Sequence, residues 1–174
     1  MPNREQQLIL DLVAHRKSQD EFLREFGIAR TEASELSLRM LEDACRHRNQ
    51  DDVDYGLLVG FVFGFSQEFV PTLIQLSDED WHHSHEDVVL ALDKLRDTRA
   101  IDALYRAALK HHPYLEYDEG RALAGKAVRA LSRIGDPVAD EKLKLLATSE
   151  DTSAKRHAIK ELRRRETVSN QAGS

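Results

Sequence analysis

The sequence predicts an all-α protein in which antiparallel helix pairs stack on one another. Apolar residues recur at helical spacing along nearly the whole chain, and no segment alternates polar and apolar residues as a half-buried strand would. Turn signals separate these stretches, and two of the resulting helix pairs are similar in sequence. The chain of 174 residues is long enough to bury a core as one domain without a disulfide or a structural metal.

The internal repeat is clearest between the segments that begin at Val88 and Ala127. A shift of 39 residues superposes Ala91 on Ala130, Leu92 on Leu131, Leu95 on Ile134, Asp97 on Asp136, Ala100 on Ala139 and Leu104 on Leu143. We expect each segment to form a helix, a tight turn and a second helix. Asp97 and Asp136 are predicted N-caps, because a carboxylate there accepts hydrogen bonds from unpaired amides, and Pro137 suits the first helical position.

The pattern A-L-x-x-[LI]-x-D-x-x-A, present at residues 91–100 and 130–139, resembles the HEAT-like repeats of phycobilisome-lyase-type proteins. The resemblance implies a right-handed α-solenoid of stacked antiparallel helix pairs. We expect a single domain over residues 1–165, with N-terminal capping helices over 1–50 and repeats over 51–165. The polar segment 166–174 lacks an apolar stripe, so it is a predicted disordered tail.

Three glycines stand at four-residue spacing in the predicted helix that follows Asp51. Gly56, Gly60 and Gly64 would share one helix face, although each glycine weakens a helix by about 1 kcal/mol relative to alanine. Because glycine has no side chain to hold a neighbour away, this spacing predicts close approach of another helix.

Composition points to the cytoplasm. Cys45 is the single cysteine, so no intrachain disulfide can form and a reducing compartment is expected. The N-terminal segment is polar and lacks the basic and apolar order of a signal peptide, and the longest uncharged apolar run, residues 56–65, is too short to span a bilayer. We therefore expect neither secretion nor membrane insertion.

Charge is divided unevenly along the chain. Residues 1–119 hold 24 Asp or Glu and 13 Lys or Arg, whereas residues 120–165 hold 6 acidic and 12 basic residues. Residues 49–93 hold ten acidic residues and no Lys or Arg, so a partner attracted to this stretch should be basic.

The segment from Trp81 to Asp87 holds three histidines and two acids, residue types that bind zinc or iron. HEAT-repeat deoxyhypusine hydroxylases hold two irons through repeated His-Glu pairs, but here the pair His85-Glu86 occurs once, and the shift of 39 residues places it on Ala124 and Gly125. We therefore expect no metal, no cofactor and no enzyme activity. The structural interpretation is that Ser84 or His85 opens a helix, that its first acids favour the helix dipole, and that Trp81 packs beneath the turn.

Three acidic segments precede or open predicted first helices of the repeats, and stacking would bring such positions to one edge. This predicted acidic-aromatic edge consists of Asp51, Asp52, Asp54, Tyr55, Trp81, His85, Glu86, Asp87, Tyr114, Glu116, Tyr117, Asp118 and Glu119. Carboxylates speed the encounter with a cationic partner, and tyrosine and tryptophan are frequent energetic centres of interfaces. The alternative is that these acids complement helix N-termini and keep the protein soluble.

The pattern W-H-x-x-H-E-D followed by L-x-Y-D-E resembles HEAT-repeat proteins encoded beside bacterial polymorphic toxins. It rests on Trp81, His82, His85, Glu86, Asp87, Leu115, Tyr117, Asp118 and Glu119. It implies a non-catalytic immunity or inhibitor protein whose carboxylates cover the nucleic-acid cleft of a basic toxin domain, such as a nuclease.

Two other classes of function stay open. Residues 156–165 form a basic helix, and HEAT-like DNA glycosylases hold a duplex on a basic surface, so the chain could bind nucleic acid or an acidic partner. A lyase or a metal-dependent HEAT-repeat enzyme is the other alternative, which stoichiometric iron or zinc in the purified protein would support.

Overall fold

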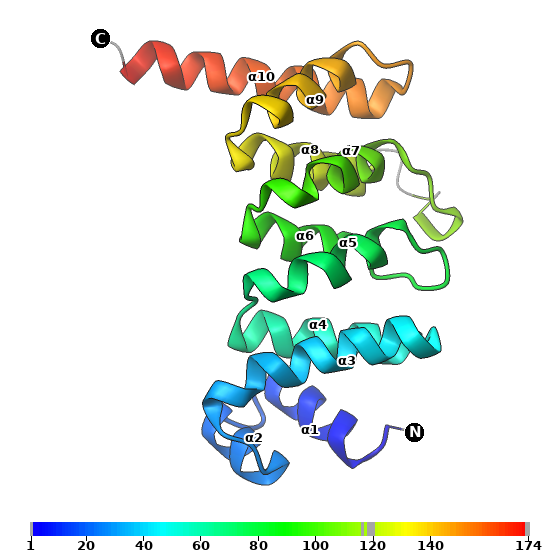
Figure 1. Cartoon of the computed structure of the whole chain (residues 1–174), viewed down its shortest axis with the longest axis vertical. Coiled ribbons are helices and arrows are strands. Elements are labelled where there is room, and N and C mark those ends of the chain that lie inside the picture. The colour runs from blue at the N-terminus through cyan, green and yellow to red at the C-terminus, as the bar shows by residue number, and fades with distance from the viewer. Residues whose placement is uncertain (1, 116, 118–120, 173–174) are drawn as a thin grey trace. The chain divides into compact units, whose positions relative to one another are not determined.

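The computed structural model describes residues 2–115, 117 and 121–172, which form helices and connecting turns with no β-strand among them (Figure 1). The prediction of an all-α fold is therefore confirmed. The chain divides into two compact units, Met1–Thr72 and Leu73–Ser174, and each unit is described by itself. The single domain over residues 1–165 stays a prediction.

The first unit contains two short helices followed by a longer pair. Its elements are α1 (Arg4–Val13), α2 (Gln19–Phe26), the 3₁₀ helix η1 (Arg30–Glu32), α3 (Ala33–His47), α4 (Gln50–Phe63), η2 (Gln67–Phe69) and the start of α5 (Val70–Asp78). Asn3 and Ser18 form capping boxes at the starts of α1 and α2. Ile9, Phe22 and Val59 are buried in the core between α1, α2 and α4.

Helices α3 and α4 pack closely because α4 carries glycines on the contact face. A Cβ atom at Gly56 would lie 2.8 Å from a side-chain carbon of Leu41, and one at Gly60 would lie 2.9 Å from the hydroxyl of Ser37. The Ser37 hydroxyl also donates a hydrogen bond of 2.7 Å to the carbonyl oxygen of Gly56. The predicted close approach is confirmed at these two glycines. It is wrong for Gly64, which ends α4 with a φ of 102° and where an added Cβ would meet nothing within 4 Å.

The predicted boundary between capping helices and repeats, at residue 50, falls between α3 and α4. These two helices contact each other extensively, and the glycine face of α4 receives side chains of α3. They therefore form one packed pair, so α3 is the natural partner of α4 within this unit.

The second unit contains five further α-helices in its described part. Its elements after α5 are α6 (His85–Leu95), η3 (Thr98–Ala100), α7 (Ile101–Leu109), η4 (Pro113–Leu115), α8 (Ala122–Ile134), α9 (Pro137–Ala147) and α10 (Thr152–Ala172). The predicted caps are confirmed: Asp97 accepts a hydrogen bond of 2.8 Å from the amide of Arg99, and Asp136 accepts one of 2.8 Å from the amide of Val138. Pro137 occupies the first position of α9.

Equivalent helices of the second unit pack on one another in register. Helix α6 contacts α8, α8 contacts α10, and α7 contacts α9 (Figure 1). Three ion pairs join residues 40 positions apart, namely Glu86 with Lys126 at 2.7 Å, Asp93 with Arg133 at 2.6 Å and Asp102 with Lys142 at 2.7 Å. Because the first two pairs keep the same offset along α6 and α8, these helices run in the same direction. The offset matches the predicted internal repeat to within one residue.

Helix α10 differs from the sequence prediction at its end. Ala154 and Ala158 are buried, as expected for a helix that packs on α8 and α9. The helix then continues beyond Glu166 to Ala172, whereas the sequence predicted a disordered tail from residue 166. Within the described part of the chain, no helix combines the length and apolar character needed to cross a membrane.

Candidate functional site

Three histidine rings stack in the second unit, and we call His82, His85 and His112 the histidine column. The ring centroids of His82 and His85 are 4.2 Å apart with planes at 17°, and those of His85 and His112 are 3.7 Å apart at 31°. The three residues are 0%, 2% and 5% exposed, respectively. The column therefore lies in the interior and joins the start of α6 to the loop that follows α7.

Hydrogen bonds set the proton positions on two of these rings. His85 donates from Nε2 to the carbonyl oxygen of Glu79 at 2.7 Å, and its Nδ1 lies 2.9 Å from the hydroxyl of Tyr114. A carbonyl oxygen can only accept, so Nε2 carries the proton and Nδ1 accepts from Tyr114. His82 follows the same logic, since Nε2 lies 2.8 Å from the carbonyl oxygen of Leu76 and Nδ1 accepts from the amide of Ser84 at 3.2 Å.

Burial keeps His85 and His112 neutral. Burial lowers the pKa of His85 from 6.5 to about 3, and burial lowers the pKa of His112 to about 4. The Nδ1 atom of His112 lies 3.8 Å from the exposed carboxylate of Asp80, which partly offsets the effect of burial on the pKa of His112. Burial also raises the pKa of Tyr114 to about 12. At neutral pH these side chains therefore act as uncharged packing and hydrogen-bonding groups.

The column also fixes the position of Tyr114. The hydroxyl of Tyr114 donates to His85 Nδ1 and accepts from the backbone amide of His85 at 3.3 Å. On the other side, Lys110 contacts the carboxylate of Asp80 at 2.7 Å. The loops before α6 and after α7 are thus tied together. Tyr117 lies three residues beyond Tyr114 and is 83% exposed.

Comparisons with known proteins give no relative. No protein-family model, curated protein or solved structure matches the chain. The residues themselves are therefore the basis for a proposed function. Among the described residues, no group of three or more His, Cys, Asp or Glu side chains is arranged to hold a metal ion.

The first four residues of the predicted acidic-aromatic edge lie on α4 in the first unit. Asp51 and Asp54 are exposed, and Asp52 is half-buried and accepts a hydrogen bond of 2.8 Å from the Asn49 side chain. Tyr55 packs against the core of this unit. Because the remaining residues belong to the other unit, their sharing of one edge with these four stays a prediction.

The other predicted residues divide between interior and surface. His85 is buried, Trp81 and Tyr114 are half-buried, and Glu86 is held in its ion pair with Lys126. Asp87 and Tyr117 are exposed. Glu116, Asp118 and Glu119 lie outside the described residues.

Trp81 has an unusual environment for a predicted contact residue. Its ring lies edge-on to His82, with centroids 5.1 Å apart, and its indole nitrogen is buried without a hydrogen-bond partner among the described residues. A buried donor without a partner costs about 1–3 kcal/mol. The packing of the indole beside the histidine column must outweigh that cost, which agrees with the structural interpretation of this segment.

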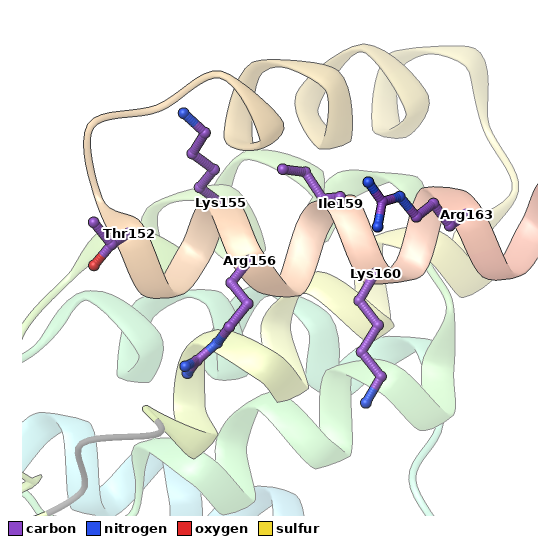
Figure 2. Close-up of a pocket in the computed structure, with 6 residues that line it drawn as sticks. All are labelled: Thr152, Lys155, Arg156, Ile159, Lys160 and Arg163. Atoms are coloured by element: carbon purple, nitrogen blue, oxygen red, sulfur yellow. The ribbon is translucent and has the colours of Figure 1, made fainter.

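A second surface lies on the last helix, where the sequence contains its basic segment. A groove of about 560 Å³ runs along α10 and is lined by Thr152, Lys155, Arg156, Ile159, Lys160 and Arg163 (Figure 2). We call this surface the α10 groove. Figure 2 shows Arg156 and Lys160 extending to one side of the helix and Lys155 to the other. The groove can therefore offer positive charge from both sides to an anionic ligand.

Proposed function

We propose that the protein is a non-catalytic binding module built as a HEAT-like α-solenoid. The ion pairs at a constant offset of 40 residues between α6 and α8 and between α7 and α9 support this architecture in the second unit. Such repeats present successive loops and helix ends to partners, so their usual function is binding.

We further propose that it is an immunity or inhibitor protein that neutralises a basic toxin domain. The observation that carries this proposal is the 83% exposure of Tyr117, three residues beyond Tyr114, whose hydroxyl is hydrogen-bonded to His85. Exposed tyrosine side chains are frequent energetic centres of protein interfaces. The sequence places carboxylates on both sides of Tyr117, which suits a cationic partner.

The contacts of each acid decide which substitutions are suitable for testing this proposal. Reversing the charge of Glu86 would break its ion pair with Lys126 and disturb the protein itself. Asp87 is exposed one residue later, so its reversal is tested with circular dichroism of the variant to verify that α6 is retained. Asp51 is the exposed acid to reverse on α4, because the carboxylate of Asp54 accepts a hydrogen bond of 2.8 Å from the Gln50 side chain.

The test is affinity capture from the native host, followed by direct binding measurements with the basic protein domain that is captured. We expect Tyr117→Ala to weaken binding by about thirtyfold or more, as loss of an aromatic interface centre does, and Asp87→Lys to slow association mainly at low salt. Glu42→Lys, at an exposed position of α3, is the matched charge control and should leave the Kd within about twofold. Unchanged affinity of the Tyr117→Ala variant would overturn the proposed surface.

A further inference from the structure

A cavity in the first unit lies between the start of α1 and the end of α2, and we call it the α1–α2 cavity. It is lined by Asn3, Arg4, Glu5, Leu8, Glu25 and Phe26. Its volume of about 410 Å³ is within the range of small-molecule sites. Helices α1 and α2 pack on each other, and Asn3 is the N-cap of α1. The walls of the cavity therefore come from two packed helices and the cap of one of them.

The apolar lining of the cavity ends a row of aromatic rings. The ring centroids of Phe63 and Phe22 are 5.6 Å apart, and those of Phe22 and Phe26 are 5.2 Å apart. Phe22 is buried, whereas Phe26 is half-buried and lines the cavity beside the buried Leu8. Aromatic pairs favour centroid separations of about 4.5–7 Å, so a ring placed in the cavity would continue this row. The apolar lining therefore favours a ligand with an aromatic side chain.

The polar lining offers one positive and one negative charge to a ligand. Arg4 and Glu5 are exposed, and neither forms an ion pair with another described residue. The other polar groups are already engaged, because the Asn3 side chain caps α1 and the carboxylate of Glu25 contacts Lys17 Nζ at 2.6 Å. One guanidinium and one carboxylate, on adjacent residues, are therefore left to meet a ligand.

We propose that the α1–α2 cavity binds a free α-amino acid with an aromatic side chain. The carboxylate of the ligand would meet the guanidinium of Arg4, its ammonium group would meet the carboxylate of Glu5, and its ring would lie against Phe26. A zwitterion carries both charges in one molecule, which complements the two charges of the lining. This proposal is independent of the recognition of a basic toxin domain, because it concerns the first unit and a small molecule.

The balance of charge separates this ligand from related ones. An aromatic carboxylic acid would place an anion beside Glu5, and an aromatic amine would place a cation beside Arg4, and like charges brought together weaken binding. The C-terminal residue of a peptide has a carboxylate but an amide in place of the ammonium group, so it meets only one of the two side chains. The free amino acid meets both.

The probe is L-phenylalanine, titrated into the isotope-labelled full-length protein and followed by nuclear magnetic resonance. We expect the backbone amides of residues 4–8 and 25–26 to shift, with a Kd on the order of 1 mM, as for a ligand of this size. N-acetyl-L-phenylalanine lacks the ammonium group and L-phenylalanine amide lacks the carboxylate. Each of these two compounds should therefore bind about fivefold more weakly than L-phenylalanine.

Paired changes in protein and ligand make the test specific. Arg4→Gln should weaken binding of L-phenylalanine about fivefold but leave binding of L-phenylalanine amide unchanged, because the amide has no carboxylate for the guanidinium to meet. Glu5→Gln should weaken binding of L-phenylalanine but not that of the N-acetyl compound, for the matching reason. The controls Arg24→Gln and Glu42→Gln remove the same charges at exposed positions outside the cavity and should bind L-phenylalanine as the unmodified protein does. Circular dichroism of each variant would verify that the helices are retained.

The aromatic contact has a test of its own. Phe26→Leu keeps the lining apolar but removes the last ring of the row, so the preference for L-phenylalanine over L-leucine should fall about threefold. Binding of N-acetyl-L-phenylalanine or L-phenylalanine amide as tight as that of L-phenylalanine would overturn the proposal and assign the cavity to a ligand with a single charge. Unshifted cavity amides at about 20 mM L-phenylalanine would overturn it as well.

Discussion

Acidification should destabilise the part of the chain that contains the histidine column well before most carboxylates are protonated. An unfolded histidine has a pKa near 6.5, whereas burial holds the pKa of His85 at about 3 and that of His112 at about 4. As the pH falls below about 6.5, these histidines bind protons in the unfolded chain but not in the folded chain. The folded state therefore loses stability as pH falls toward the folded pKa values, and it is fully stabilised above about pH 6.5.

The size of the effect follows from the number of protons. Each histidine that is protonated only in the unfolded state lowers the free energy of unfolding by up to about 1.4 kcal/mol per pH unit. Solvent near exposed Asp80 and half-buried Tyr114 screens part of the energy needed to charge a buried histidine. We therefore expect the free energy of unfolding to fall by about half of this limiting value per pH unit. Between about pH 6.5 and pH 4.5 the two histidines would then remove about 3 kcal/mol, a large share of the stability of a typical domain.

The assay is urea unfolding at a series of pH values, followed by tryptophan fluorescence. Trp81 is the only tryptophan of the chain and lies against His82, so its emission reports on the column, while circular dichroism reports on all helices. In His112→Phe a flat ring remains in the stack but cannot take up a proton, so the loss of stability on acidification should fall by about half. The control His15→Asn removes an exposed histidine at a positive φ that asparagine tolerates, and it should keep the full loss.

Two results would refute this reasoning. One is a free energy of unfolding, measured by Trp81 fluorescence, that does not change between about pH 7 and pH 5. The other is a His112→Phe variant whose pH dependence equals that of the unmodified protein.

Three further predictions concern packing, capping and the ion pairs. Gly56→Ala should destabilise the first unit by about 1–2 kcal/mol in urea unfolding despite the better helix propensity of alanine, because its Cβ would meet the buried side chain of Leu41; equal or higher stability would show that α3 can move away. Asp136→Ala should cost about 1 kcal/mol through loss of the α9 cap, measured as a lower urea midpoint, and Asp136→Asn should recover most of it. Lys126→Glu should lower the melting temperature and the exchanged pair Glu86→Lys with Lys126→Glu should restore much of it, whereas additive losses would show that the two side chains do not interact.

Local signals explain which parts of the fold the sequence predicts correctly. The caps at Asp97 and Asp136 depend on a side chain and an amide two residues away, so a short segment contains all the necessary information. The close approach at Gly56 and Gly60 is also predictable, because close packing compensates for the low helix propensity of glycine. The prediction for Gly64 is wrong because helix termination at a positive φ favours glycine as strongly as close packing does.

The candidate site is harder to predict because its contacts join distant segments. The sequence places His85 on a surface edge, yet the residue is buried against His112, and nothing in the residues around either histidine indicates that pairing. The role of Glu86 can be found from the sequence, since applying the repeat shift to charged residues places acids of one helix beside bases of the next. The shift of 39 residues nevertheless places Glu86 on Gly125, one position short of Lys126, so only the structure identifies the pair.

The ion pairs of the second unit have a direction that bears on how such a chain can grow. In the three pairs at an offset of 40 residues, the acid always comes from the earlier helix and the base from the later one. Helix α6 thus supplies only acids and α8 only bases to this contact, so a copy of α6 in the place of α8 would set carboxylates against carboxylates. An insertion within either helix would separate each charge from its counterpart, which ties changes in the length of one helix to changes in the other.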